Sequence, residues 1–498
     1  MRPTSTALAA TLVASALTGG VLLTAPSATA SVPGVLSAAA PAAPAKPAKF
    51  GDDFNGDGYR DLVIGNGDHG KDGRVTVVYG TASGPGTRTQ VIHQDSPGIP
   101  GAVETGDMWG VASATADLDR DGYGDLIVSA PGEQVGRVKY RGGLTIIWGG
   151  KSGLGAGTTL HSTQTSGGPD QGDFFGETMV TGDFDGDGDQ DIVSSSNSPA
   201  GALFLKGPFS RAGKYGGQQP LGGYGYLNVS ELIAGNVDGK GGTDLYIVGY
   251  DLYQNIPAKQ QPVFLHRGGA SFADRPVHTL RVPDDGGGQQ GPGLSVIGDF
   301  DKDGFGDLAV GRGLENTDRG RGSVIVHYGS ADGRPKRTQT LSQDTAGVPG
   351  AAEDGDNFGS ALDAGDVNGD GYADLAVGAF GEDAGKLRNT GMVTVLRGGS
   401  GGLTGKGATA FDQSTANVAD TPEVDDAFGL TLKLADYTRD GRADLLVNVN
   451  EELGGKNRWG LVQILKGSPS GTTTSGAKHF TLDSLKLKYR TLGTYLTR

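Results

Sequence analysis

The stretch "DFDGDGDQD", residues 183–191, places five aspartates in nine positions. Like charges this close repel each other unless a cation lies between them. Asp183, Asp185 and Asp187 alternate along the chain and Asp191 closes the stretch, so their carboxylates can converge on one ion. Ca²⁺ takes six to eight oxygen ligands at about 2.3–2.6 Å. The stretch therefore predicts a calcium-binding loop.

The rest of the stretch agrees with a metal loop but not with an EF-hand. Gly188 at position 6 allows the positive φ of a sharp turn, and Asp189 at position 7 is expected to offer its main-chain carbonyl. An EF-hand needs a bidentate Glu at position 12 and flanking helices, whereas position 12 here is Ser194. The runs after such loops, "DLVIG" and "DLIVS", are typical of strands. The ion is therefore expected between two strands.

Composition limits the classes of protein to consider. At 498 residues the chain exceeds one ordinary compact core, which favours several domains or a repeat array. It has 90 Gly without a collagen period, no Cys, and 36% hydrophobic residues, enough to bury a core. The net charge of −15 and the lack of a basic stripe argue against nucleic acid and anionic membrane surfaces as partners.

The N-terminal region resembles a secretory leader followed by a linker. Residues 1–30 contain an apolar core, Ala7–Leu23, and a small-residue cleavage pattern ending at Ala30, so we expect a signal peptide and a secreted, extracellular protein. A membrane anchor is the alternative, disfavoured by Gly19–Gly20 and the short apolar run. Residues 31–48 are Ala/Pro-rich and are expected to be a linker. No later segment is apolar enough to span a bilayer.

The acidic motif recurs seven times along the chain. Loops 1 to 7 are nine residues each and begin at Asp53, Asp117, Asp183, Asn236, Asp299, Asp366 and Asp436. A β-rich run ending in a Gly-rich turn, such as "TIIWGGKSG", also recurs seven times. A third marker, an aromatic residue followed by Gly, precedes four loops by eight residues, at Trp109, Phe175, Phe358 and Phe428. Repeats at this spacing point to one supersecondary unit per repeat.

One unit reads strand, acidic loop, strand, turn, strand, Gly-rich turn, strand. Four short antiparallel strands in about 65 residues are typical of a propeller blade, and seven blades close a ring. The fold class predicted for residues 49–498 is therefore an all-β, seven-bladed propeller with the loops between first and second strands. Pro44 and Pro47 make the stretch before loop 1 a poor inner strand. We therefore expect residues 492–497 to supply the inner strand of blade 1.

The three markers together resemble the FG-GAP repeat of integrin α-subunit propellers. The resemblance covers residues 50 to about 498, and it implies that loops which keep the ligands bind Ca²⁺. It implies neither a particular ligand nor a hydrolytic activity.

Five loops keep the full set of donors and a sixth keeps part of it, which predicts about five Ca²⁺ sites and an uncertain one in loop 7. The expected metal residues are Asp53, Asn55, Asp57, Tyr59 and Asp61 in loop 1; Asp117, Asp119, Asp121, Tyr123 and Asp125 in loop 2; Asp183, Asp185, Asp187, Asp189 and Asp191 in loop 3; Asp299, Asp301, Asp303, Phe305 and Asp307 in loop 5; Asp366, Asn368, Asp370, Tyr372 and Asp374 in loop 6; and Asp436, Asp440 and Asp444 in loop 7. The alternative is that these side chains only cap backbone amides.

Loop 4 departs from the pattern, because Asn236 replaces the first acid and Lys240 the third. We expect no metal there, with the Lys240 ammonium inside the loop and paired with Asp238 and Asp244.

A second set of acids precedes the aromatic-Gly marker and is expected on the face opposite the loops. It comprises Asp107, Asp173, Asp356 and Asp426, with Glu104, Asp170, Glu353 and Glu423 three residues earlier. Turn formation and inter-blade hydrogen bonding is the favoured interpretation. An acidic ligand-binding rim is the alternative, which rests on analogy to integrins.

Nothing in the sequence singles out a catalytic group. "GGSGG" around Ser400 matches a nucleophile pattern, but it lies in a blade turn with no helix after it. We therefore favour a calcium-stabilised, monomeric binding or adhesion module for an extracellular protein or glycan. The alternatives are a polysaccharide hydrolase or lyase acting on the opposite face, for which paired acids remain candidates, and a Ca²⁺ sensor.

Overall fold

The apolar runs that follow the acidic loops form the second strand of every sheet. In β5 (Asp125–Ala130) all six residues are buried, as expected of a short apolar strand covered on both faces by neighbouring sheets. The computed structural model describes residues 47–66, 73–163, 172–197, 201–222, 227–251, 260–274, 276–283, 293–313, 319–452, 459–489, 491–492 and 495–497.

The described strands fall into seven antiparallel sheets of four, and no helix occurs among the described residues. From the inner to the outer strand, blade 1 consists of β28 (Tyr495–Leu496), β1 (Leu62–Asn66), β2 (Arg74–Val78) and β3 (Thr89–Ile92), blade 2 of β4 (Ser113–Ala116), β5, β6 (Gly143–Ile147) and β7 (Gly157–Leu160), and blade 3 of β8 (Met179–Gly182), β9 (Asp191–Ser195), β10 (Ala202–Lys206) and β11 (Gly217–Leu221). Blade 4 consists of β12 (Leu227–Gly235), β13 (Asp244–Asp251), β14 (Gln260–His266) and β15 (His278–Pro283), and blade 5 of β16 (Gly293–Gly298), β17 (Asp307–Gly311), β18 (Val324–Tyr328) and β19 (Arg337–Leu341). Blade 6 consists of β20 (Ala361–Gly365), β21 (Asp374–Ala379), β22 (Met392–Arg397) and β23 (Thr404–Phe411), and blade 7 of β24 (Thr431–Ala435), β25 (Asp444–Glu452), β26 (Trp459–Lys466) and β27 (Thr473–Thr481).

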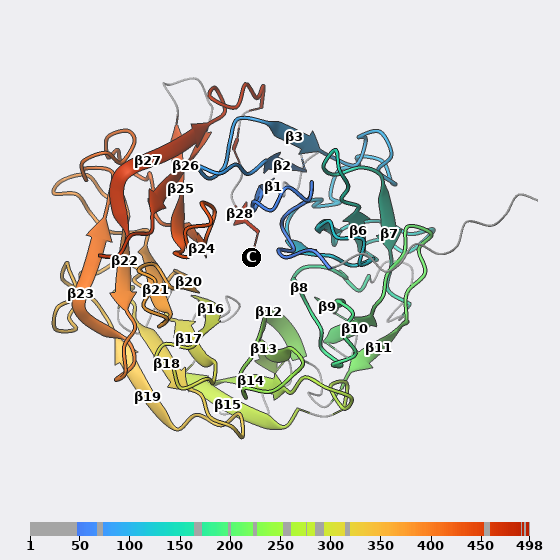
Figure 1. Ribbon diagram of the computed structural model, residues 1–498, viewed down its shortest axis with the longest axis horizontal. Helices are drawn as coiled ribbons and strands as arrows, with labels where there is room; N and C mark the ends of the chain where they lie inside the picture. The colour runs from blue at the N-terminus through green and yellow to red at the C-terminus, as the bar shows by residue number, and fades with distance from the viewer. Residues whose placement is uncertain are drawn as a thin grey trace, which may run out of the picture. The chain divides into compact units, whose positions relative to one another are not determined.

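The sheets follow one another around a central axis in chain order (Figure 1). Seven apolar clusters lie between them, one at each junction of neighbouring blades. Leu144 of blade 2 packs with Leu203 of blade 3, for example, and Ile64 of blade 1 packs with Leu446 of blade 7. Seven junctions for seven blades mean a closed ring. The prediction of a seven-bladed all-β propeller is confirmed.

The ring is closed by the end of the chain. β28 is the inner strand of blade 1, with Tyr495 opposite Gly65 and Leu496 opposite Ile64. It contacts β24 of blade 7. On its other side, Thr497 Oγ1 lies 2.6 Å from Ser113 Oγ at the start of β4. A segment from the end of the chain thus occupies the place that the other blades fill with their own first strand.

The aromatic-Gly marker lies at the entrance to the inner strand. Trp109, Phe175, Phe358 and Phe428 are all buried. The Gly after each has a positive φ, and the N–H of Gly176, for instance, donates to the carbonyl of Ser195 on the second strand. The marker therefore anchors the chain as it enters a blade.

The expected signal peptide, residues 1–30, and nearly all of the expected linker, 31–48, lie outside the described residues. Among the residues that are described, no helix has the length and apolarity needed to cross a bilayer.

Candidate metal centres

The acidic loops lie at one edge of the sheets, between the first and second strands. Loop 2 joins β4 to β5 and loop 3 joins β8 to β9, and the other inner strands are followed in the same way. Loop 1 leads into β1, whose inner neighbour is β28.

The Asp at position 1 binds amides of its own loop. Asp117 Oδ1 accepts from the N–H of Asp121, and Oδ2 from that of Gly122, both at 3.1 Å. Gly122 has φ +92°, the conformation expected of position 6. The same pair of bonds recurs at Asp53, Asp299, Asp366 and Asp436. These loops are therefore shaped by their own side chains.

The Asp at position 9 links the loop to a distant turn. Asp125 is fully buried. Its Oδ2 accepts from the N–H of Leu118 at 2.9 Å, and its Oδ1 from that of Gly149, after the third strand, at 2.8 Å. Burial raises the pKa of Asp125 to about 8, although both amides favour the ionised form.

All seven loops share this link, including loop 4. The other pairs of position-9 Asp and turn Gly are Asp61 with Gly80, Asp191 with Gly207, Asp244 with Gly268, Asp307 with Gly329, Asp374 with Gly398 and Asp444 with Gly467. Burial raises the pKa to about 7 for Asp61 and Asp307 and to about 6 for Asp191, Asp374 and Asp444.

The turn glycine is required by close packing. A Cβ on Gly149 would lie 2.0 Å from the carbonyl oxygen of Gly124, at position 8 of the loop. The sequence revealed both the seven aspartates and the seven Gly-rich turns, but not that they bind each other. The sequence did contain a signal for this link, because each of the seven loops, loop 4 included, has an Asp at position 9 and is followed by one Gly-rich turn.

Three loops bring carboxylate oxygens together tightly enough for one ion. In each, three acids contribute oxygens that all lie within 4.8 Å of one another: Asp117, Asp119 and Asp125; Asp183, Asp185 and Asp191; Asp299, Asp301 and Asp303. A buried Oδ1 without a hydrogen-bond partner occurs at Asp119, Asp183, Asp185 and Asp301. A buried oxygen without a donor is costly, and carboxylate oxygens are the ligands that Ca²⁺ prefers. Loops 2, 3 and 5 therefore fit a hard cation.

The Asp at position 5 is held through the residue at position 7. Asp121 Oδ1 accepts from the N–H of Tyr123 at 3.0 Å. The other expected position-7 residues, Tyr59, Asp189, Phe305 and Tyr372, donate in the same way to Asp57, Asp187, Asp303 and Asp370. The expected role of their carbonyls in metal binding stays a prediction.

Cationic side chains from outside the loop pair with the acids of loops 2, 3 and 5. Arg211 Nε lies 3.0 Å from Asp119, and one of its terminal nitrogens 2.7 Å from Asp121. Lys206, the last residue of β10, contacts Asp185 and lies 2.8 Å from Asp187. This pairing raises the pKa of Lys206 and lowers that of Asp187.

Loop 5 has Lys336 in the same role. Its Nζ lies 3.2 Å from Asp301 and contacts Asp303.

Loops 1 and 6 have Asn instead of Asp at position 3, and the side chain of this Asn donates a hydrogen bond to the Asp at position 5. Asn55 Nδ2 donates to Asp57 Oδ2 at 2.9 Å, and Asn368 Nδ2 to Asp370 Oδ2 at 2.7 Å. An Asp at position 3 thus comes with an external cation, and an Asn there supplies the donor itself. Sequence reasoning missed these cations, because they lie well outside the motif.

Loop 4 differs from the expectation in two respects: Lys240 is not enclosed by the loop, and it does not pair with Asp244. Lys240 Nζ pairs with Asp238 at 3.2 Å, but its side chain is 62% exposed, and Arg267 Nε pairs with the same carboxylate at 3.2 Å. The expected pairing of Lys240 with Asp244 is not seen, because the oxygens of Asp244 accept backbone amides.

Loop 7 carries its cation within the motif. Arg442 pairs with Asp440 at 3.1 Å, while Asp436 and Asp444 bind amides as in the other loops. A metal ion in loop 7 stays a prediction.

The acids on the opposite face serve as turn caps. Asp107 Oδ2 accepts from the N–H of Glu104 at 2.8 Å, and Asp356 Oδ2 accepts from that of Glu353 at 2.6 Å. Asp426 and Glu423 form the same contact. Across blades, Arg141 lies 3.7 Å from Asp173. These contacts agree with the interpretation of the acids as turn-forming and inter-blade residues. Asp170 lies outside the described residues.

Ser400 lies in the exposed turn between β22 and β23. Since no helix occurs among the described residues, the structure does not give it the strand-to-helix setting of a nucleophile elbow.

Comparisons with known proteins point to one repeat family. An FG-GAP repeat profile matches residues 291–327 and 358–396, and an FG-GAP-like repeat profile matches 53–128. Integrin alpha-PS2 of Drosophila melanogaster is 30% identical over 236 residues, which cover 45% of this chain and 16% of that protein. Integrin alpha-V of Gallus gallus is 29% identical over 227 residues, covering 43% and 21%. The chain thus matches about a fifth or less of these relatives' length.

Two solved structures are weakly similar. Rhamnogalacturonan lyase YesW has a TM-score of 0.31 and 10% identity, with 91% of this chain and 70% of that one covered. The Dos1 propeller has a TM-score of 0.38 and 9% identity, with 86% of each chain covered.

Proposed function

Because the chain is an FG-GAP repeat protein built as an integrin-alpha-like seven-bladed propeller, we propose that it is a secreted, calcium-stabilised module that binds a protein or glycan partner. In this proposal the acidic loops are structural sites. Asp119, Asp185 and Asp301 are the first choice as ligands, since each keeps a buried oxygen without a donor. A bound Ca²⁺ would supply the positive charge that these oxygens lack.

The distribution of exposed apolar side chains supports a binding surface on the face opposite the loops. The large apolar side chains that are clearly exposed among the described residues are Tyr140, Val277, Leu387, Val424 and Trp459. Tyr140, Leu387 and Val424 lie in connections between second and third strands or between blades, and Trp459 is the first residue of the third strand β26; these positions are on the opposite face. Exposed apolar groups gathered on one face are typical of interaction sites.

Tyr140 is the most suggestive member of this set. Its side chain is 42% exposed, and its ring stacks on Phe174 with centroids 5.0 Å apart. Both residues have positive φ, 55° and 46°, which is unusual for bulky side chains. Backbone held in this conformation presents an aromatic pair at the boundary of blades 2 and 3, where a sugar ring or an apolar side chain could stack.

The test is a screen of the purified chain, in Ca²⁺, against immobilised glycans and extracellular proteins. We expect a hit whose binding Tyr140→Ala weakens about tenfold or more, while Val277→Ala, on the loop face, leaves it unchanged. Equal binding by both variants would place the partner elsewhere. Cleavage products in a parallel incubation with polysaccharides would favour the enzyme alternative instead.

A further inference from the structure

The residue at position 4 divides the acidic loops into two kinds. Loops 1, 3, 4 and 6 have Gly there, whereas loops 2, 5 and 7 have the cations Arg120, Lys302 and Arg439. These three residues have φ of 57°, 57° and 59°, a left-handed conformation that non-glycine residues seldom adopt. Three loops therefore keep a cation in a backbone conformation that suits Gly better.

Two of these cations reach forward to the next loop around the ring. A terminal nitrogen of Arg120, in loop 2, lies 2.8 Å from the carboxylate of Asp189, at position 7 of loop 3. Lys302 Nζ, in loop 5, donates to the main-chain carbonyl of Asp370 in loop 6 at 2.8 Å. It also lies 5.2 Å from the ring centroid of Tyr372, at position 7 of loop 6, within the range of a cation–π contact.

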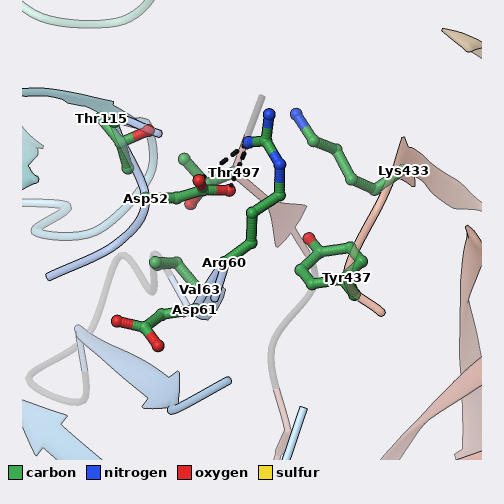
Figure 2. Close-up of a pocket in the computed structure, with 9 residues that line it drawn as sticks. Asp52, Arg60, Asp61, Val63, Thr115, Lys433, Tyr437 and Thr497 are labelled. Atoms are coloured by element: carbon green, nitrogen blue, oxygen red, sulfur yellow. Dashed lines mark hydrogen bonds and ion pairs between the residues drawn. The ribbon is translucent and has the colours of Figure 1, made fainter. Parts of the chain in front are cut away.

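The third cation makes the same contact where the ring closes. The guanidinium of Arg439, in loop 7, lies 5.1 Å from the ring centroid of Tyr59, at position 7 of loop 1. Tyr437 of loop 7 and Arg60 of loop 1 line one cavity of about 230 Å³ together with Lys433 (Figure 2). Because this space separates the bases of the two loops, the contact between Arg439 and Tyr59 is an important link across the junction.

Two junctions without a cation use the aromatic residue at position 7 alone. A Cβ on Gly56, at position 4 of loop 1, would lie 2.7 Å from the ring of Tyr123 in loop 2. A Cβ on Gly239 of loop 4 would lie 3.2 Å from the ring of Phe305 in loop 5. The absence of a side chain at position 4 thus lets the next loop pack closely.

The last two junctions show the rule and its exception. A Cβ on Gly369 of loop 6 would lie 3.4 Å from Cγ of Arg442, at position 7 of loop 7. Between loops 3 and 4, position 4 is Gly186 and position 7 is Gly242, so no side chain can make the contact. Six of the seven junctions therefore join position 4 of one loop to position 7 of the next.

This contact acts on groups that are expected to hold Ca²⁺. In loop 6, Tyr372 donates its N–H to Asp370 at position 5, at 3.0 Å, and its carbonyl is an expected ligand. In loop 5, Lys302 stands between the expected ligands Asp301 and Asp303. An ion that draws these two carboxylates together favours the left-handed turn at Lys302, which directs the ammonium at loop 6. Occupancy of one loop therefore acts on the shape of the next.

We propose that Ca²⁺ binding to one acidic loop favours Ca²⁺ binding to the next, with Arg120, Lys302 and Arg439 as positioning residues. The coupling runs between nearest neighbours, as between the units of other repeat proteins, and it is weakest between loops 3 and 4. It rests on the calcium sites of the proposed function and adds that they fill cooperatively. Coupling of binding is reciprocal, so each loop of a pair favours the other equally.

The test is hydrogen exchange of the full chain over a range of Ca²⁺ concentrations, read by mass spectrometry of peptides that contain loop 6. Asp301→Ala removes the buried, unpartnered oxygen of loop 5 and impairs that metal site. We expect it to raise about fivefold the Ca²⁺ concentration at which loop 6 is half protected from exchange. In the Lys302→Gly background the same substitution should have a much smaller effect, because the link is already lost.

Lys302→Gly should fold, since four other loops have Gly at position 4. Lys302→Arg is the conservative variant, and it should keep the effect of Asp301→Ala on loop 6, because arginine can reach the same carbonyl and ring. Lys151→Gly is the charge control, since it removes an exposed lysine from a turn of blade 2, and it should keep the effect as well.

The coupling is overturned if Asp301→Ala leaves loop 6 unchanged, or if it acts on loop 6 equally with and without Lys302→Gly. A different result bears on the proposed function. If exchange in loop 6 of the wild type does not respond to Ca²⁺ at all, the calcium sites themselves are wrong, and the coupling between them falls with them.

Discussion

Aspartates at the first and last positions of an acidic loop accept main-chain amides, whereas those at position 3 keep a buried oxygen free in loops 2, 3 and 5. Asp183, at position 1 of loop 3, does both. The same residue type thus has two physical roles within nine residues. Position 9 shapes the blade, because it links the loop to the turn after the third strand. Position 3 provides negative charge, which an external cation or a metal ion can balance.

Loop 4 allows the shaping role to be measured alone, since no metal is expected there. Asp244 accepts three amides, from Val237, Asp238 and Gly268. Asp244→Ala leaves these buried donors unsatisfied and should lower the free energy of unfolding by about 3 kcal/mol. Denaturant unfolding should give the same loss in Ca²⁺ and in chelator. A loss that appears only in Ca²⁺ would mean that loop 4 binds metal after all.

The external cations should compete with metal ions. Lys206 pairs with Asp185 and Asp187, so Lys206→Gln removes a competitor from loop 3. We expect Ca²⁺ affinity at this loop to rise about three- to tenfold, and the melting temperature in chelator to fall, because the acids then repel each other without a counter-ion. Isothermal titration and thermal melts measure the two effects.

Lys214→Gln is the control for this experiment. Lys214 is exposed on the connection between β10 and β11, and its substitution changes the net charge equally. If Ca²⁺ affinity rises equally in both variants, the effect comes from the overall charge of the chain, and the prediction that Lys206 competes with the metal is wrong.

Glu382, on the opposite face, should make stability depend on pH. Burial, with Asp356, Glu353 and Asp383 nearby, raises its pKa to about 7 from 4.5, although Gln343 donates to it at 2.7 Å. The folded chain therefore holds this proton more tightly than the unfolded chain, and its contribution favours folding as pH falls from 8 toward 5.

Glu382→Gln keeps the contact to Gln343 but removes the charge. We expect its melting temperature to exceed that of the wild type by about 1–3 °C at pH 8, and the difference to vanish near pH 5. Melting curves across this range measure the effect. A variant that is less stable than the wild type at pH 8 would contradict it.

β28 is the shortest strand, yet it fills the inner position of blade 1. Leu496 is 8% exposed and packs in the apolar cluster between blades 7 and 1, with Leu62 and Ile64. Without it, the inner edge of β1 would be open, and open edges invite association with other chains. A two-residue strand can therefore control the integrity of the ring.

Removal of residues 492–498 tests this role. The truncated chain should melt several degrees lower and form oligomers, because β1 loses its inner partner and Leu492 and Leu496 leave the core. Thermal melts and light scattering report both changes. Leu496→Ala, which retains the strand but leaves a cavity, should cost about 2–3 kcal/mol without association. A truncated chain that stays monomeric with an unchanged melting temperature would contradict this role.

The propeller as a whole carries an acidic loop at the same edge of all seven sheets. A ligand that binds only the folded chain stabilises it by about 1.4 kcal/mol per site at ten times Kd. In the proposed function several Ca²⁺ sites would act together on one ring, and no disulfide is available, since the chain lacks Cys.

Chelation should accordingly lower the melting temperature by several degrees, and excess Ca²⁺ should restore it. Mg²⁺ at equal concentration is the control, since it demands a tighter octahedral site. A melting curve that is the same in chelator and in Ca²⁺ would show that the loops are held by amides and side-chain cations alone.

The fold follows from the amino-acid sequence alone, because the repeated motifs report on local physics. Alternating acids with Gly at position 6 predict a tight loop, and the apolar runs after them predict buried strands. Seven copies of two separate markers predict seven blades. These features depend on residues within one repeat, so they can be read without knowing where the repeats lie in space.

Which acids keep free oxygens, and which cations face them, depends on contacts that form in the folded chain. Lys206, Arg211 and Lys336 reach acids 21 to 92 residues away in the chain. Arg60 and Lys433 share a cavity although more than 350 residues separate them. Arg211 reaches the loop of the preceding blade, and Arg60 meets Lys433 where the two ends of the ring join, whereas Lys206 and Lys336 reach the loop of their own blade. No spacing within the nine-residue motif encodes these contacts, because they form only once the strands of a blade, or neighbouring blades, have come together.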